Sequence, residues 1–72
     1  MKEKTFKLRI DQPYITLNKL LQVLGIAQTG GHAKIMILNE EVMVNGLIET
    51  RVRNKLIKGD IVQTSGTTIS IV

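Results

Sequence analysis

Residues 42–62 read VMVNGLIETRVRNKLIKGDIV, and this stretch decides the fold. Asn45-Gly46 stands between short apolar runs, which is the strongest short-range signal for a tight β-hairpin. Lys58-Gly59-Asp60 predicts a second turn that leads into another strand. A cationic segment lies between the two turns, so the stretch predicts a rigid hairpin beside a charge that favours a polyanion.

The flanking sequence predicts one more hairpin and a first helix. Ser65-Gly66 separates two β-branched-rich segments, at 61–64 and 67–72, as expected for a hairpin. Thr16 is a suitable helix N-cap, and Gly25 is a suitable residue after a helix end. The leucines between them recur at helical spacing and predict a helix at 17–24: Leu17, Leu20, Leu21 and Leu24.

Thr29 repeats the capping pattern and predicts a second helix at 30–38. The apolar stripe of this helix is wide and contains Ala33, Ile35, Met36, Ile37 and Leu38. Such a helix is expected to be covered on two sides or to touch a partner. Asn39 is expected to end it, because asparagine tolerates the left-handed conformation.

Residues 5–10 alternate between polar and apolar, which predicts a strand at 4–10 with Phe6, Leu8 and Ile10 on its buried face and Lys7 and Arg9 on its outer face. This strand is expected to join the sheet, since alone it could not bury that face. The chain is therefore predicted to be a single α+β domain, residues 1–72, in which an N-terminal strand and two short helices precede a small, mostly antiparallel sheet.

Composition restricts the function. The 72 residues carry ten Lys and Arg against six Asp and Glu, and this net charge of +4 favours nucleic acid or another anionic surface. Cysteine is absent, and no apolar run approaches the roughly 20 residues of a membrane span. We expect a cytoplasmic monomer that does not bind membranes.

Catalytic chemistry is hard to build from these residues. His32 is the only histidine, and no nucleophile elbow, P-loop or dinucleotide fingerprint occurs. We therefore expect no enzyme activity, metal site, cofactor or small-molecule substrate.

The cationic segment contains the first candidate site. If residues 51–55 are extended, Arg51, Arg53 and Lys55 point the same way and form a row that could follow the phosphates of a nucleic acid. A solvated strand face would explain the same pattern.

The start of the second predicted helix is the other candidate. Gly30 and Gly31 let a backbone approach the free helix amides, while His32 and Lys34 could stack on a base or bind a phosphate. An ordinary capped helix start is the alternative. Secondary candidates are Lys19 and Lys58.

The few aromatic residues indicate which nucleic acid is expected. Only Phe6 and Tyr14 are aromatic, whereas proteins that bind single-stranded RNA stack bases on aromatic side chains. The expected ligand is therefore a folded RNA that is recognised through its shape and its phosphates.

Residues 33–37, 42–46 and 55–62 together resemble the S-four RNA-binding domain, also called the αL motif, over about residues 14–64. The Thr29–Lys34 segment and the N-terminal strand resemble the free-standing YaaA/YbcJ group of small bacterial proteins. The resemblance implies binding of structured RNA, in particular ribosomal RNA, and a role in ribosome assembly. It assigns RNA contact to the two candidate sites, although Gly30 replaces a common arginine and Glu40 a common glycine.

Other functions remain open. A protein-interaction module would use the apolar second helix and an exposed sheet edge. Double-stranded DNA fits less well, because the second helix has few polar side chains for a major groove. A ubiquitin-like sulfur carrier needs a C-terminal Gly-Gly, whereas this sequence ends Ser70-Ile71-Val72.

Overall fold

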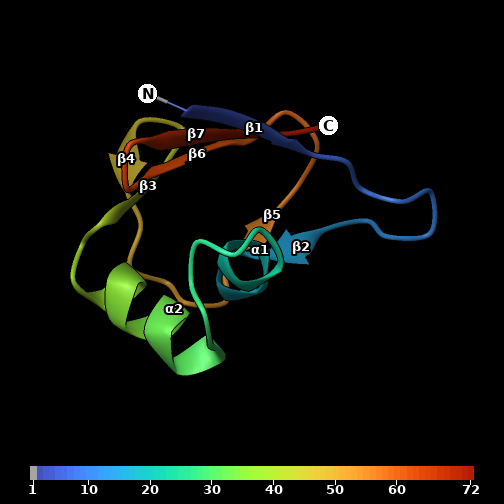
Figure 1. Ribbon diagram of the computed structural model, residues 1–72. Coiled ribbons are helices and arrows are strands. Elements are labelled where there is room, and N and C mark those ends of the chain that lie inside the picture. The colour runs from blue at the N-terminus through green and yellow to red at the C-terminus, as the bar shows by residue number, and fades with distance from the viewer. Residues whose placement is uncertain (1) are drawn as a thin grey trace.

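Two helices lie on one face of a five-stranded sheet in the computed structural model, which describes residues 2–72 (Figure 1). The sheet order is β1-β7-β6-β3-β4, and among the strand pairs of this sheet within residues 2–72 only β1–β7 is parallel. The elements are β1 (Lys2–Phe6), β2 (Ile15–Thr16), α1 (Leu17–Val23), α2 (Gly30–Leu38), β3 (Val42–Val44), β4 (Leu47–Ile48), β5 (Lys55–Leu56), β6 (Ile61–Thr64) and β7 (Thr67–Ile71). This architecture confirms the predicted α+β class.

A second, two-stranded sheet places the end of the cationic segment beside α1. Its strands β2 and β5 pair antiparallel, with Ile15 opposite Leu56 and Thr16 opposite Lys55. The pair lies beside α1, on the helical side of the large sheet (Figure 1). Ile15 and Leu56 are both buried, so this short ribbon is part of the core.

Both predicted hairpins are present, and their turns have the expected backbone. Asn45 and Gly46 have φ values of 52° and 84°, and Ser65 and Gly66 have 50° and 73°. Two successive residues with positive φ give the turn whose twist matches that of the flanking strands. The turn signals in the sequence were therefore sufficient to place β3–β4 and β6–β7.

Side chains join the Asn-Gly turn to the Lys-Gly-Asp turn. Asn45 Nδ2 donates to Asp60 Oδ1 at 3.0 Å, and Ile61 N donates to Asn45 Oδ1 at 2.9 Å. Asp60 Oδ2 also accepts a hydrogen bond from Ile57 N at 2.9 Å. These hydrogen bonds hold the β3–β4 turn and the turn before β6 together, on the two sides of the cationic segment in the sequence.

The core lies between the helices and the large sheet. Its buried apolar residues are Ile15, Leu17, Leu20, Leu21, Ala27, Ala33, Met36, Ile37, Val42, Leu56, Val62, Ile69 and Ile71. The α2 stripe is buried at Ala33, Met36 and Ile37 as predicted, but Ile35 and Leu38 are exposed. The helix is therefore covered on one side, not two.

The end of α2 differs from the prediction by one residue. Asn39 has φ −82°, and the left-handed residue is Glu40 with φ 62°. Glu40 N donates to Ile37 O and Glu41 N to Met36 O, both at 3.1 Å. These two bonds form a Schellman motif, which places the left-handed residue one position after the cap. The prediction followed the preference of asparagine for the left-handed conformation, whereas the hydrogen bonds at the helix end place that conformation at Glu40.

The N-terminal strand joins the sheet, but the predicted range of 4–10 is wrong. Strand β1 pairs with β7 from Lys2 opposite Thr67 to Phe6 opposite Ile71. The last bond along this edge runs from Leu8 N to Val72 O, at 2.8 Å. Beyond this bond no strand among residues 2–72 pairs with the chain at 9–10, and Ile10 lies fully exposed in a loop instead of on the buried face.

Candidate nucleic-acid interface

The cationic segment is bent rather than extended. Residues 52–53 form a turn that is closed by Asn54 N donating to Arg51 O at 3.1 Å, and only Lys55 belongs to a strand. The predicted straight row of Arg51, Arg53 and Lys55 is therefore wrong. The three side chains still line one surface hollow of about 470 Å³, together with Asn54.

The start of α1 causes this bend. Leu17 N donates to Asn54 O at 2.9 Å, and Asn18 N donates to Val52 O at 3.1 Å. The first amides of a helix need acceptors from outside the helix, and the Thr16 side chain supplies none here. The carbonyls of the cationic segment cap α1 instead, which fixes the segment on the helix and leaves its cations outside.

Arg51 is held by a carboxylate that the sequence analysis did not single out. Its Nε and Nη2 donate to the two carboxylate oxygens of Glu49 at 2.9 and 3.0 Å, and Arg51 N also donates to Glu49 at 2.9 Å. These hydrogen bonds lower the pKa of Glu49 to about 2. The spacing of two residues was a usable signal, because such residues share one side of an extended chain.

Arg53 and Lys55 keep their charge available. Both are exposed, and neither forms an ion pair with any residue in the described range 2–72. The Lys55 ammonium lies 4.9 Å from the ring centroid of Tyr14, within the range of a cation–π interaction. Tyr14 is thus a further candidate residue at the site.

The start of α2 has the predicted cap. Thr29 Oγ1 accepts from His32 N at 3.0 Å, and Gln28 N donates to His32 Nδ1 at 3.2 Å. His32 therefore orders the turn before α2 in addition to being exposed. The Gly30 and Gly31 amides stand at the first two helical positions, where the helix itself offers them no acceptor.

Helix α1 connects the two candidate elements. Residues 52–54 cap its first turn, and Gln22 in its last turn approaches Gly30, where an added Cβ would lie 3.7 Å from Gln22 Oε1. Seven helical residues span about 10 Å. The elements thus lie near opposite ends of one short helix.

The secondary candidates lie elsewhere. Lys19 and Lys58 line different hollows, and each of these hollows also contains Lys7 and Arg9. The sequence analysis placed Lys7 and Arg9 on the outer face of a strand and did not consider them as site residues.

Within residues 2–72 no group of three metal-ligating side chains is close enough to hold an ion. No helix in the same range has the length and apolar character needed to cross a membrane.

The fold and this capped cationic segment define a small αL-motif domain. A family model described as "S4 domain" matches residues 8–72, and the chain belongs to that family. The chain is 37% identical over 60 residues to "Putative RNA-binding protein YbcJ" of Escherichia coli (strain K12), covering 83% of this chain and 86% of the relative. It is 39% identical over 57 residues to "Probable ribosome maturation protein RlbA" of Bacillus subtilis (strain 168), covering 79% and 80%.

A solved structure supports the same assignment. The solution structure of YbcJ from E. coli, whose description reports an αL motif involved in RNA binding, superposes with a TM-score of 0.71 at 37% identity. The match covers 94% of this chain and 85% of that one. The predicted family and fold are confirmed, whereas the residue assignments remain predictions.

Proposed function

We propose that this protein binds structured RNA without catalysing a reaction, that its target is ribosomal RNA, and that it acts in ribosome maturation. The carrying observation is the capping of α1 by the Val52 and Asn54 carbonyls, which holds Arg53 and Lys55 outward at a fixed place. The name of the E. coli relative supports RNA as the ligand, and the name of the B. subtilis relative supports a role in ribosome maturation.

The proposed interface comprises the two predicted elements with unequal roles. Arg53 and Lys55 bind phosphates directly, while Arg51 contributes less because Glu49 already satisfies one edge of its guanidinium. The Gly30 and Gly31 amides bind a second phosphate about one α1 length away, with Lys34 beside them.

A charge-matched pair of double variants tests this function. Arg53→Ala/Lys55→Ala removes two cations from the interface, and Lys2→Ala/Lys4→Ala removes two from β1. With E. coli ribosomal RNA as the probe, the first variant should lose about tenfold in affinity per contact at 0.1 M salt, and its salt slope should fall by about two units. The β1 variant should change much less. Equal losses in both variants, or none in either, would contradict the proposal.

A protein-interaction role is the second candidate, because apolar side chains are exposed on α2 and at the β4 edge. They are Ile35 and Leu38 on α2, and Leu47 and Ile48 on β4. This role predicts a partner that stays bound after nuclease treatment and in high salt, and that is lost on Ile35→Ser/Leu38→Ser.

A further inference from the structure

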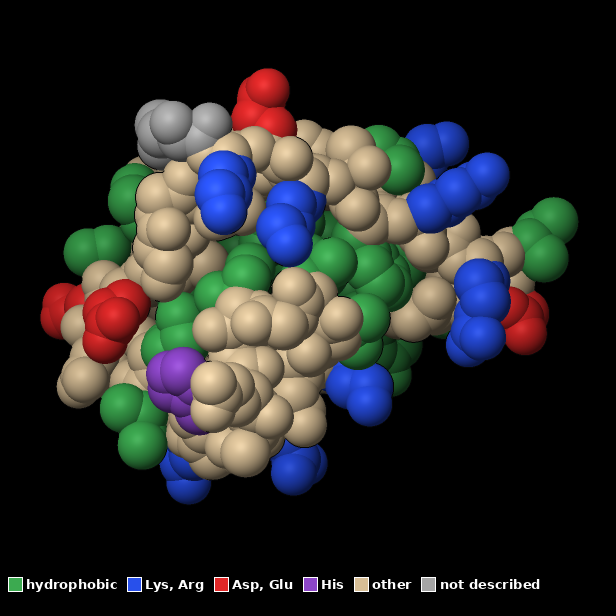
Figure 2. All heavy atoms as spheres, viewed as in Figure 1, with side chains coloured by type: hydrophobic (Ala, Val, Ile, Leu, Met, Phe, Trp, Pro, Cys, Tyr) green, Lys and Arg blue, Asp and Glu red, His purple; other side chains and the backbone are tan. Residues whose placement is uncertain are grey.

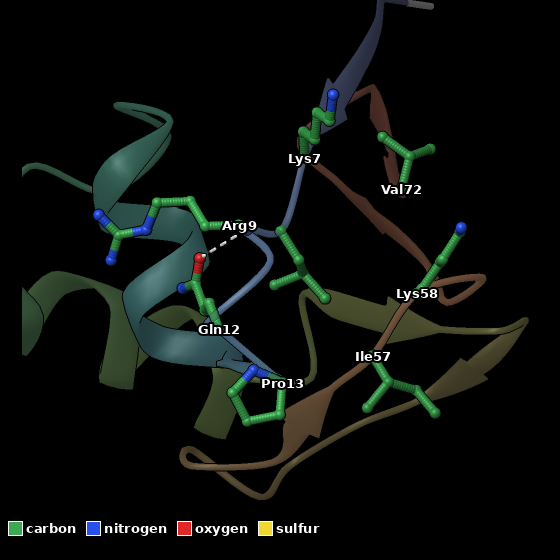
Figure 3. Close-up of a pocket in the computed structure, with 8 residues that line it drawn as sticks. Lys7, Arg9, Gln12, Pro13, Ile57, Lys58 and Val72 are labelled. Carbon is green, nitrogen blue, oxygen red and sulfur yellow. Dashed lines mark hydrogen bonds between the residues drawn. The ribbon is translucent and has the colours of Figure 1, made fainter.

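Three basic residues line a hollow between the β1–β2 loop and the turn after β5 (Figure 3). The hollow has a volume of about 380 Å³. Its basic residues are Lys7, Arg9 and Lys58, of which Arg9 directs its guanidinium toward α1 and away from the hollow (Figure 3). The apolar part of the lining is Leu8, Pro13, Ile57 and Val72. Figure 2 shows several basic side chains near the end of the molecule that bears this loop.

Backbone hydrogen bonds hold both walls of the hollow to the end of β7. Leu8 N donates to Val72 O on one side, and Gly59 N donates to Ile71 O on the other, each at 2.8 Å. Gln12 N donates to Arg9 O at 2.9 Å and closes the loop on itself. The cations therefore stand on fixed walls.

The hollow continues the proposed RNA interface along β5. Leu56 is buried, whereas Lys55 before it and Ile57 after it are both exposed. The three residue steps from Lys55 to Lys58 span at most about 10 Å, and consecutive phosphates of one strand of duplex DNA are about 3.4 Å apart along its axis. A nucleic-acid strand bound at Lys55 can thus reach Lys58 within a few nucleotides.

The charge around the hollow is poorly compensated. Arg9 Nε lies 3.8 Å from Asp11 Oδ1, but both side chains are 79% exposed, so this pair is weak. The Asp60 carboxylate, close to Lys58 in the sequence, already accepts hydrogen bonds from Asn45 Nδ2 and Ile57 N. Lys7 and Lys58 form no ion pair with any residue of the described chain. Cations around an apolar floor match a nucleotide, which offers both a phosphate and the face of a sugar or base.

We propose that this hollow binds a second stretch of the sugar–phosphate backbone of the RNA held at Arg53 and Lys55. Lys7 and Lys58 bind its phosphates, and Pro13 and Ile57 pack against a ribose or base. This inference rests on the proposed function and adds a second contact region to it, on the side of β5 away from α2.

The test compares Lys7→Ala/Lys58→Ala with the two double variants described above, all with E. coli ribosomal RNA. The four residues Lys2, Lys4, Lys7 and Lys58 are exposed, and a matching thermal midpoint establishes that each variant is folded. Lys7→Ala/Lys58→Ala should weaken binding about tenfold per contact and lower the salt slope by about two units. Its loss should add to that of Arg53→Ala/Lys55→Ala, since the two pairs contact separate phosphates.

Three outcomes would overturn the inference. If only Arg53→Ala/Lys55→Ala weakens binding, the second site is wrong and the proposed function stands. If no variant changes RNA affinity, both proposals fail. If Lys7→Ala/Lys58→Ala leaves RNA affinity intact but abolishes binding of an acidic protein that stays bound after nuclease treatment, the hollow is a protein site.

Discussion

The two proposed RNA-contacting elements obtain their shapes in different ways. The start of α2 is shaped by neighbours in the sequence, since Thr29 caps His32 and His32 accepts from Gln28. The cationic segment is shaped by residues more than thirty positions away, since Leu17 and Asn18 donate to its carbonyls. Local hydrogen bonds can be inferred from a short motif, whereas the bend at 51–54 depends on where the fold places α1.

Removing a buried side chain next to the cationic segment should have the largest effect. Leu56→Ala deletes a fully buried side chain opposite Ile15 and should cost about 2–5 kcal/mol, a large share of the stability of a domain this small. Urea unfolding measures the loss. Leu56→Met keeps most of the volume and should cost less than about 1.5 kcal/mol. Equal costs in the two variants would mean that the volume removed by alanine is not what destabilises the protein.

The two threonine caps offer a direct contrast between the regions. Thr29→Ala removes a cap hydrogen bond and should cost about 1 kcal/mol in the free energy of unfolding. Thr16→Ala should cost less, because distant carbonyls and not the Thr16 side chain cap α1. Thermal unfolding of both variants checks the order, and a larger loss at Thr16 would contradict this account of α1.

The far end of α2 tests whether Glu40 is the strained residue. Glu40→Gly relieves a left-handed conformation at φ 62° and should stabilise the protein by up to about 1 kcal/mol. Asn39→Gly is the matched control, because φ −82° gives glycine no advantage there. Stabilisation by the Asn39 variant alone would restore the prediction made from residue preference.

The smallest effect on stability should come from protonating Glu49 at low pH. The pKa of Glu49 is lowered to about 2 in the folded protein, chiefly by its hydrogen bond with Arg51. A lowered pKa contributes stability above the unfolded value near 4.5 and loses it as the pH falls toward 2. The difference in thermal midpoint between the native chain and Glu49→Gln should therefore shrink over that range. A constant difference would mean that the ion pair contributes nothing, and the exposure of Arg51 keeps the expected effect small.

The sequence predicted those parts of the fold that short patterns control. The helix at 30–38 and both hairpins were placed correctly, because caps, glycine turns and side-chain periodicity act within a few residues. The range of β1 was wrong, because it depends on where its partner β7 ends. The predicted extended row of cations at 51–55 was also wrong because of a distant partner, since the segment bends where its carbonyls meet the start of α1.

The site was predicted less completely than the fold. The composition and the order of the motifs indicated the basic residues of the site. The ion pair between Glu49 and Arg51 was missed, because it depends on the direction of both side chains. Lys7 and Arg9 were missed because their loop was assigned to a strand. The signal that could have found them was the run of basic residues on the outer face of that predicted strand.

One titration tests the central claim that the start of α2 and the cationic segment form one RNA interface. E. coli ribosomal RNA fragments selected for binding would be added to ¹⁵N-labelled protein, and the amide resonances followed. The account predicts that Gly30, Gly31, Arg53 and Lys55 change together at the same RNA concentration. Changes confined to Ile35, Leu38 and the β4 edge, or changes at one element without the other, would contradict it.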